Sequence, residues 1–498
     1  MQSTTVLRDL LNLIPMGTLP FLLLLPLLGA IVAFMSGEHR ARYVGVAATL
    51  VELILSLAML SVFDPALDSY EAVTYTVLVM GTIMSEPIAI TLGVDGISVV
   101  LVLLANLVMF VAILSASHIE HSQKSFYSLM LLLQTGLVGV FISTNLIGFF
   151  LFWELVLIPM FFVIGEWGEE GAQHAAVKFF VYTQIGSLAM LIGFFAVFVT
   201  AGSLDMLRLR TLMSTVPLEI QVLFAIAVFL GAGVKLPVWP FHNWLPYAHV
   251  KAPTPGSVVL AGILLKMGGY AFVRLGLWLN AGAFFRLAVP FALLAVFTCI
   301  YAAFTAMAQG DLKSLVAYTS INHMAWVLLG VAAGSQLAIV GAVFMMFSHG
   351  AIISVLFIVA GLLKHSAGSR MIDEVSGLGS RAPRLSGVFV LASLAAFGLP
   401  TLSGFVAEVL ILFGSIQVFV WSGLIAFGIF VTVGYFLWTL NRMVYSEGRE
   451  DRAMSDASLS DLVAPAVMLV FVVALGVWPD LILVIISEAV SDIAGVVP

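Results

Sequence analysis

Charged side chains inside apolar segments are the feature of this sequence that could do chemistry. Lys235 and Lys266 each lie in a run apolar enough to cross a bilayer, and so does Glu154, in NLIGFFLFWELVLIPM. A charge inside hydrocarbon costs from about 2.5 kcal/mol on insertion scales to over about 10 kcal/mol in simulations, so such residues usually have a function. The pattern predicts an ion pathway, and protons are the ion that these groups suit best.

The helical rise gives the depth of these residues. Glu154 lies roughly 13 Å into its helix when counted from Asn145, close to the bilayer middle. Lys266 follows Lys251 by 15 residues and is also deep. We interpret Glu154 as the partner of Lys235, because pairing lowers the cost of burying both charges. A carboxylate satisfied by a neighbouring polar group is the alternative.

Histidines at similar depth could connect the charged groups. His323 lies ten residues past Lys313, and His349 lies in the middle of its apolar run. The unperturbed pKa of histidine, about 6.5, suits it to passing protons. His242 and His249 flank an interrupted segment and are further candidates. The alternative for each of them is a core histidine whose hydrogen bonds are satisfied by its neighbours.

Prolines and glycines interrupt two of the apolar segments. Between Lys235 and Lys266 there are five prolines, and FGLPTLSGFVAEVL at 397–410 places Leu-Pro and glycine before Glu408. Interrupted helices in corresponding halves are typical of inverted-repeat transporters, whose ion sites lie at the breaks. Glu408 is therefore predicted to be the counterpart of Lys235.

Composition sets the class of protein. Of the 498 residues, 62% are apolar and 9% are charged, whereas soluble domains have about 25% charged residues. The net charge of −7 comes without a basic patch, which argues against nucleic-acid binding. One cysteine, Cys299, excludes a disulfide or a cysteine-ligated iron–sulfur cluster within the chain. Phosphate loops, dinucleotide fingerprints and zinc spacings are absent, so we expect neither a cofactor nor a metal here.

Runs of roughly 20 apolar residues predict an all-α polytopic membrane protein with about fourteen spanning helices. The predicted spans are 19–36, 43–63, 96–117, 125–143, 145–165, 174–200, 219–237, 252–275, 283–308, 313–333, 337–363, 385–413, 418–442 and 461–486. Residues 64–95 form a longer connection that carries Asp64, Asp68, Glu71 and Glu86. We divide the chain into N-terminal helices 1–3 (1–124), a first five-helix unit (125–275), a second, inverted unit (283–442) and a C-terminal loop with helix 14 (443–498).

Lysine and arginine favour the cytoplasmic connections of membrane proteins. With the N-terminus outside, thirteen of them fall inside: Arg40, Arg42, Lys124, Lys178, Lys251, Lys313, Lys364, Arg370, Arg381, Arg384, Arg442, Arg449 and Arg452. Five fall outside: Arg8, Arg208, Arg210, Arg274 and Arg286. Both termini are therefore expected on the outer side of the membrane.

The chain resembles the antiporter-like membrane subunits of respiratory complex I, and most closely the M-type chains (chain 4) of proton-translocating NADH–quinone oxidoreductase. The resemblance covers nearly the whole length. It rests on LGVDGIS at 92–98, FWELVLIPM at 152–160, HNWLPYAHVKAPTPGSVVLAGILLKMGGY at 242–270, DLKSLVAYTSINHM at 311–324 and SHG at 348–350.

This resemblance implies fourteen helices, two inverted five-helix repeats and broken helices 7 and 12. The family's helix 5 glutamate, helix 7 lysine and helix 8 lysine fall on Glu154, Lys235 and Lys266. The helix 12 residue falls on Glu408, where M-type chains have glutamate and the L- and N-type chains usually have lysine. Tyr247 departs from the family pattern, which has an acid at that place.

The function implied is proton translocation as a non-redox subunit of a membrane NADH:quinone oxidoreductase, in a bacterial inner membrane. FMN, iron–sulfur clusters and quinone are expected in partner subunits, and L-type and N-type chains and lipids are the expected neighbours. We predict that Lys235 passes its proton through water and histidines to Lys266 and on to Glu408. The rival functions are a multisubunit Na+/H+ antiporter subunit, a ferredoxin- or hydrogenase-linked complex, and a structural scaffold with vestigial charges.

Overall fold

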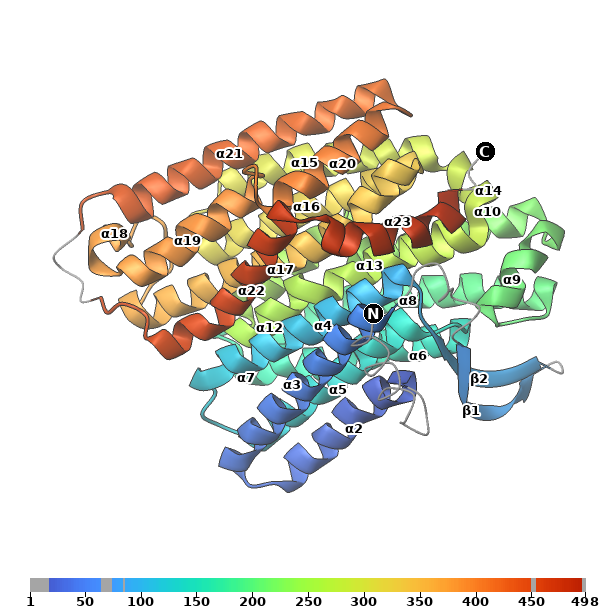
Figure 1. Cartoon of the computed structure of the whole chain (residues 1–498), viewed down its shortest axis with the longest axis horizontal. Helices are drawn as coiled ribbons and strands as arrows, with labels where there is room; N and C mark the ends of the chain where they lie inside the picture. Colours follow the sequence, from blue (N-terminus) through green and yellow to red (C-terminus); the bar gives the residue numbers. More distant parts are fainter. Residues whose placement is uncertain (1–17, 64–73, 84–85, 449–453, 495–498) are drawn as a thin grey trace.

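The computed structural model describes residues 18–63, 74–83, 86–448 and 454–494 and shows a bundle of long helices (Figure 1). Twelve of the described helices are long and apolar enough to cross a membrane, and three shorter apolar helices accompany them. The predicted helical membrane fold is confirmed. Arg8, Arg449, Arg452, Asp64, Asp68, Glu71 and the two chain ends lie outside the described residues.

The helices follow the predicted runs closely. The N-terminal helices are α2 (Thr18–Met35), α3 (Glu38–Val62) and α4 (Gly96–Leu114), which continues into η1 (Ser115–His118). The next group is α5 (Gln123–Ile142), α6 (Leu146–Leu155), α7 (Leu157–Trp167), α8 (Ala172–Ala201), α9 (Met206–Leu212), η2 (Met213–Thr215), α10 (Leu218–Lys235), η3 (Phe241–Asn243), α11 (Trp244–Lys251), α12 (Thr254–Val259), η4 (Leu260–Leu264), α13 (Leu265–Ala271), η5 (Phe272–Trp278) and α14 (Leu279–Arg286).

The remaining helices are α15 (Ala288–Met307), α16 (Leu312–Ala333), α17 (Gln336–Ala367), α18 (Leu378–Arg381), α19 (Pro383–Ala396), α20 (Ser403–Ile416), η6 (Val420–Ile425), α21 (Ala426–Leu440), η7 (Asn441–Tyr445), α22 (Leu459–Val477) and α23 (Asp480–Ala494). The last predicted span, 461–486, is divided between α22 and α23, because the chain leaves the helix at Trp478 and Pro479.

Part of the predicted connection 64–95 is an antiparallel hairpin of β1 (Thr74–Ile83) and β2 (Glu86–Gly93). Threonine and valine are frequent in β1 and isoleucine in β2, and β-branched residues fit a pleated surface. The hairpin lies beside α9 at one end of the bundle (Figure 1), where Arg208 forms an ion pair with Glu86. The chain is therefore helical within the membrane but carries this ribbon at its edge.

Helix breaks occur at both predicted places. Helix α10 ends at Lys235, and Pro237 cannot donate the next helical hydrogen bond, so Val238 N bonds to Gly233 O instead. Residues 397–402 separate α19 from α20, and Gly398 there has φ +75°. A third break, between α6 and α7, was not predicted. It follows from Pro159, whose ring would clash with the carbonyl of Leu155 in an unbroken helix.

Two long helices form the buried centre of the bundle. Residues Thr254–Arg286 and Gln336–Ala367 each form a long helix with a completely buried apolar core. The first includes the π-helical segments η4 and η5 and continues past the predicted end at 275, with a kink at Asn280, where φ is −137° and ψ is 44°. The two helices touch closely, because a Cβ on Gly350 would meet the carbonyl of Gly262. This centre carries Lys266 and His349.

Candidate functional site: a buried line of lysine, histidine and glutamate

The first pair of predicted residues meets where two helices are broken. Lys235 is the last residue of α10 and is 1% exposed, and Glu154 stands at the end of α6. Lys235 Nζ donates to Trp153 O at 3.2 Å and lies 4.3 Å from the centre of the Trp153 ring. Within the described residues Glu154 and Lys235 form no ion pair, and Glu154 Oε1 has no hydrogen-bond partner. Lys235 thus contacts Trp153, the residue next to Glu154, and not the Glu154 carboxylate itself.

Lys266 is held by a histidine from the other central helix. Its Nζ lies 2.7 Å from His349 Nδ1 and also donates to Ala261 O, in the π-helical segment η4. When Lys266 is charged its ammonium can only donate, and His349 Nδ1 then accepts and carries its own proton on Nε2. Lys266 is fully buried and His349 is 2% exposed. The two side chains therefore form a hydrogen bond that is shielded from solvent.

The line continues from His349 to Glu408. The rings of His349 and His323 are 5.4 Å apart, and His323 Nε2 lies 3.8 Å from Glu408 Oε1. Lys266, His349, His323 and Glu408 come from α13, α17, α16 and α20, so four separate elements converge on one buried row. Glu408 also touches the break before α20, since a Cβ on Gly398 would meet its carboxylate.

The predicted order of the line was wrong in one respect. The histidines were expected between the two lysines, yet His349 and His323 lie between Lys266 and Glu408. Counting along a helix gives the depth of a residue but not the direction in which it points. No hydrogen bond joins Lys235 to Lys266 in the described part of the chain, although a Cβ on Gly268 would meet the backbone at the end of α10.

His242 and His249 form no hydrogen bond with this row among the described residues. The ring of His242 packs against Tyr301 at 5.2 Å, and that of His249 stacks on Phe357 at 4.3 Å. Both histidines are buried, and their ring nitrogens have no hydrogen-bond partner among the described residues. Neither ring therefore matches the alternative of a core histidine whose hydrogen bonds are satisfied. His242 follows the break after Lys235 and remains a candidate for water contact there.

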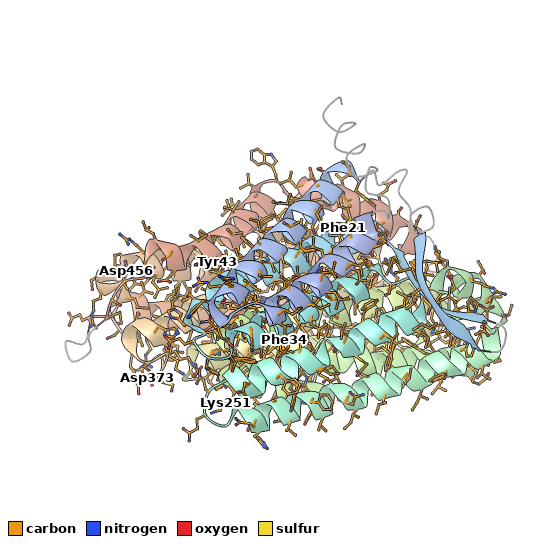
Figure 2. All side chains as sticks on the ribbon, turned by 90° about the horizontal axis from the view of Figure 1, so that it is seen from below. Phe21, Phe34, Tyr43, Lys251, Asp373 and Asp456 are labelled. Carbon is orange, nitrogen blue, oxygen red and sulfur yellow. The ribbon has the colours of Figure 1, made fainter. Side chains whose placement is uncertain are left out.

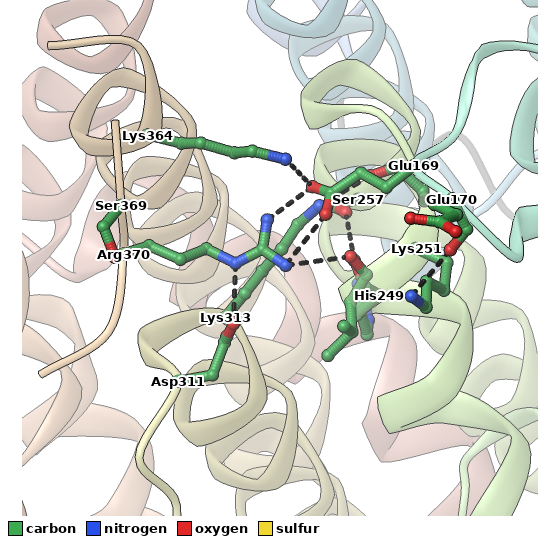
Figure 3. Close-up of polar contacts among 12 residues, drawn as sticks. Glu169, Glu170, His249, Lys251, Ser257, Asp311, Lys313, Lys364, Ser369 and Arg370 are labelled. Atoms are coloured by element: carbon green, nitrogen blue, oxygen red, sulfur yellow. Dashed lines mark hydrogen bonds and ion pairs between the residues drawn. The ribbon is translucent and has the colours of Figure 1, made fainter. Parts of the chain in front are cut away.

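A polar network at the end of the bundle was not predicted from the sequence (Figure 3). Arg370 donates to Glu169 at 2.5 and 3.2 Å, to Asp311 at 2.8 Å and to Val250 O at 3.1 Å. Lys364 Nζ lies 2.8 Å from Glu169. Burial by itself would raise the pKa of Glu169, but hydrogen bonds from Arg370 and Lys364 outweigh it and lower that pKa.

This network joins four connections that the sequence placed on the cytoplasmic side. They follow α7, α11, α15 and α17, and Lys313 adds a hydrogen bond to Ala252 O at 2.6 Å. A cavity of about 310 Å³ adjoins the network and is lined in part by Glu169, Lys313, Lys364 and Arg370. Lys251, Asp373 and Asp456 lie toward the same end (Figure 2). The four connections therefore share one face of the protein.

Two residues that the sequence singled out, Tyr247 and Arg274, have surroundings that it did not predict. Tyr247, where the resemblance led us to expect an acid, is 55% exposed, and Lys178 Nζ lies 3.7 Å from its ring centre. The tyrosine ring thus provides a cation–π contact to this lysine. Arg274 was counted among the outside residues, but it is fully buried in η5 and bonds to Asp95 at 2.5 Å.

The family model described as "NADH:quinone oxidoreductase/Mrp antiporter, TM" matches residues 143–434. The chain belongs to this family. It is 38% identical to NADH-quinone oxidoreductase subunit M of Rhodobacter capsulatus, over 92% of this chain and 91% of that protein. It is 35% identical to F(420)H(2) dehydrogenase subunit M of Methanosarcina mazei, over 97% and 99% of the two chains.

A solved structure agrees with these relatives. A chain of respiratory complex I from Thermus thermophilus with bound NADH superposes with a TM-score of 0.87 and 25% identity, covering 96% of this chain and all of that one. The antiporter-like fold expected from the motifs is thus confirmed. The chain is an integral membrane protein of the antiporter-like class found in multisubunit complexes.

Proposed function

We propose that this chain translocates protons as a non-redox subunit of a membrane NADH:quinone oxidoreductase. The observation that carries the proposal is the row from Lys266 through His349 and His323 to Glu408, with its 2.7 Å contact at one end and its 3.8 Å contact at the other. Each histidine has two ring nitrogens, so it can accept a proton on one and release a proton from the other. The row therefore has the chemistry of a proton relay.

The driving step lies at Glu154 and Lys235. Quinone reduction in partner subunits would shift the position of Glu154 relative to Lys235, which is held by the Trp153 carbonyl. Lys235 would then release its proton through water toward Lys266, and Glu408 would release it outside. Moving one charge against 100 mV takes about 2.3 kcal/mol, which modest changes in charge pairing can supply.

The chain would supply neither FMN nor iron–sulfur clusters nor a quinone site; these belong to partner subunits. L-type and N-type antiporter-like chains and membrane lipids are its proposed neighbours. We place it in a bacterial inner membrane with both termini on the periplasmic side. In this arrangement, 125–275 and 283–442 act as the two inverted units, and the breaks after Lys235 and before Glu408 lie in corresponding places of the two.

The test uses the whole complex, reconstituted in vesicles and driven by NADH and a quinone. Lys266→Ala and Glu408→Gln should each lower the number of protons pumped per NADH oxidised, while the assembled complex still contains all its subunits. Arg384→Ala removes an exposed charge outside the row and is the matched control. If both row variants pump as well as the control, the chain is a structural scaffold and the relay is wrong.

A second candidate function is a subunit of a multisubunit Na+/H+ antiporter, since the matching family description includes such proteins. The electron donor also differs among relatives, as the dehydrogenase from Methanosarcina mazei shows by its name. Mild purification of the native complex, followed by mass spectrometry of the companion subunits, separates these functions. Companions with iron–sulfur clusters support the oxidoreductase; small membrane subunits alone, together with Na+-driven proton movement, support the antiporter.

A further inference from the structure

A second buried acid lies outside the row and outside the segment 143–434 that the family model matches. Glu52 is fully buried near the middle of α3, where α3 packs against α4 and α5. Asn106 on α4 and Gln134 on α5 are also fully buried, and each is near the middle of its helix. Three helices thus bring one carboxyl and two amides together at mid-membrane depth.

The contacts form one connected set. Asn106 Nδ2 donates to Glu52 Oε2 at 3.3 Å and to Ser56 Oγ at 2.5 Å, and Gln134 Nε2 donates to Asn106 Oδ1 at 2.8 Å. Ser56 Oγ donates to the backbone carbonyl of Glu52 at 2.8 Å. Within the described residues, Glu52 Oε1 and Gln134 Oε1 have no hydrogen-bond partner. The set contains two acceptor oxygens and lacks a donor for them.

Among the described residues, no opposite charge faces Glu52 from the helices packed on it. The described parts of α2 and α4 contain no charged or titratable side chain, and Asp95 caps the far start of α4. On α5 only Lys124 and Tyr127 qualify, near its first turn and roughly 10–15 Å along the axis from Gln134. On α3 itself the titratable side chains lie in the first turns: Glu38, His39, Arg40, Arg42 and Tyr43. The two arginines are roughly 15 Å or more from Glu52 along the helix axis.

We propose that Glu52 is a proton-binding site in the N-terminal helices, with Asn106 holding one carboxyl oxygen and the bound proton on the other. Burial of a carboxylate without a countercharge is strongly unfavourable, whereas a neutral carboxyl group needs only hydrogen bonds. The proton on Oε1 supplies the donor that this set lacks. The site is separate from the row between Lys266 and Glu408, and it does not depend on the proposed function.

A hydrophobic carbodiimide tests the site in the native complex, because it reacts with protonated carboxyl groups inside membranes. The carboxyl proton passes to a carbodiimide nitrogen, the carboxyl oxygen bonds to the central carbon, and rearrangement leaves a stable N-acylurea that peptide mass spectrometry detects. We expect modification of Glu52, decreasing as the pH rises and unaffected by Na+ at constant ionic strength. Glu38, exposed in the first turn of the same helix, is the internal reference and should stay unmodified.

Labelling of the wild-type complex tests the proposal without any variant, and two variants provide further tests. Glu52→Gln should abolish the label and remove one carbonyl stretching band of a protonated carboxyl from the infrared spectrum. Asn106→Leu removes a hydrogen bond that favours the ionised form, so labelling should persist to higher pH. An unmodified Glu52 at every pH overturns the proposal. Protection by Na+ also overturns it, because the site would then bind a sodium ion.

Discussion

His349 is the residue on which the row depends most directly. Its Nδ1 lies 2.7 Å from Lys266 Nζ, and its ring faces His323. In His349→Gln the amide oxygen can still accept from Lys266, but an amide does not carry protons. We expect assembly to be retained and the pumping rate to fall roughly 100-fold, in the range for loss of a general acid–base group. Normal pumping by this variant would show that the hydrogen bond is only structural.

Glu169 gives a prediction about pH. Its folded-state pKa is lowered, since hydrogen bonds from Arg370 and Lys364 outweigh the effect of burial. A lowered pKa means stability that is fully present above the ordinary glutamate pKa and is lost as the pH falls through the folded value. We expect Glu169→Gln to lower the unfolding temperature of the purified complex at neutral pH. The difference from wild type should shrink below about pH 4.5. A constant difference at all pH values would contradict this origin.

At the scale of elements, the break between α19 and α20 positions Glu408. Gly398 has φ +75°, and a Cβ there would meet the Glu408 carboxylate. Gly398→Ala adds strain of about 1–2 kcal/mol and pushes the carboxyl group away from His323. We expect proton pumping to fall sharply while the subunit still assembles. Gly434→Ala is the matched control, because a Cβ at that position meets nothing within 4 Å. Equal pumping by the two variants would show that this break does not position the acid.

The breaks themselves could be predicted from the sequence, because proline and glycine act locally. Pro237 and Gly398 mark them without reference to any other helix. The break beside Glu154 was equally readable from Pro159. Glu52 could also have been predicted as a functional residue. It lies in the middle of the predicted span 43–63, where, as for Glu154, a buried charge is costly. The order of His349 and His323 in the row could not be read, since it depends on how α16 and α17 rotate about their axes.

At the scale of the whole molecule, contacts between residues far apart in the sequence are the part of the structure that the sequence does not predict. Glu169 and Arg370 are 201 residues apart, and no local pattern predicts their contact. The charge bias of the connections predicted their common face, which the network of Figure 3 supports. The same bias misplaced Arg274, because a count of charges cannot distinguish an exposed arginine from one whose partner, Asp95, lies across the bundle.

Asp95 and Arg274 join the N-terminal helices to the central helix, and this pair can be tested apart from the helix cap. Asp95 Oδ1 accepts from Ser98 N at 2.8 Å, while Oδ2 lies 2.5 Å from Arg274. Asp95→Asn keeps a cap, because asparagine is an equally good N-cap residue, but removes a carboxylate charge in contact with a fully buried guanidinium. We expect a loss of about 3–5 kcal/mol, measured as a lower unfolding temperature and a lower yield of assembled complex.

The double variant Asp95→Asn with Arg274→Met decides the cause of that loss. Methionine fills much of the same volume without a charge, so most of the lost stability should return. Recovery would show that the buried arginine charge without the Asp95 carboxylate, and not the cap, was responsible for the loss. If the double variant is as unstable as Asp95→Asn alone, the carboxylate acts through contacts other than Arg274.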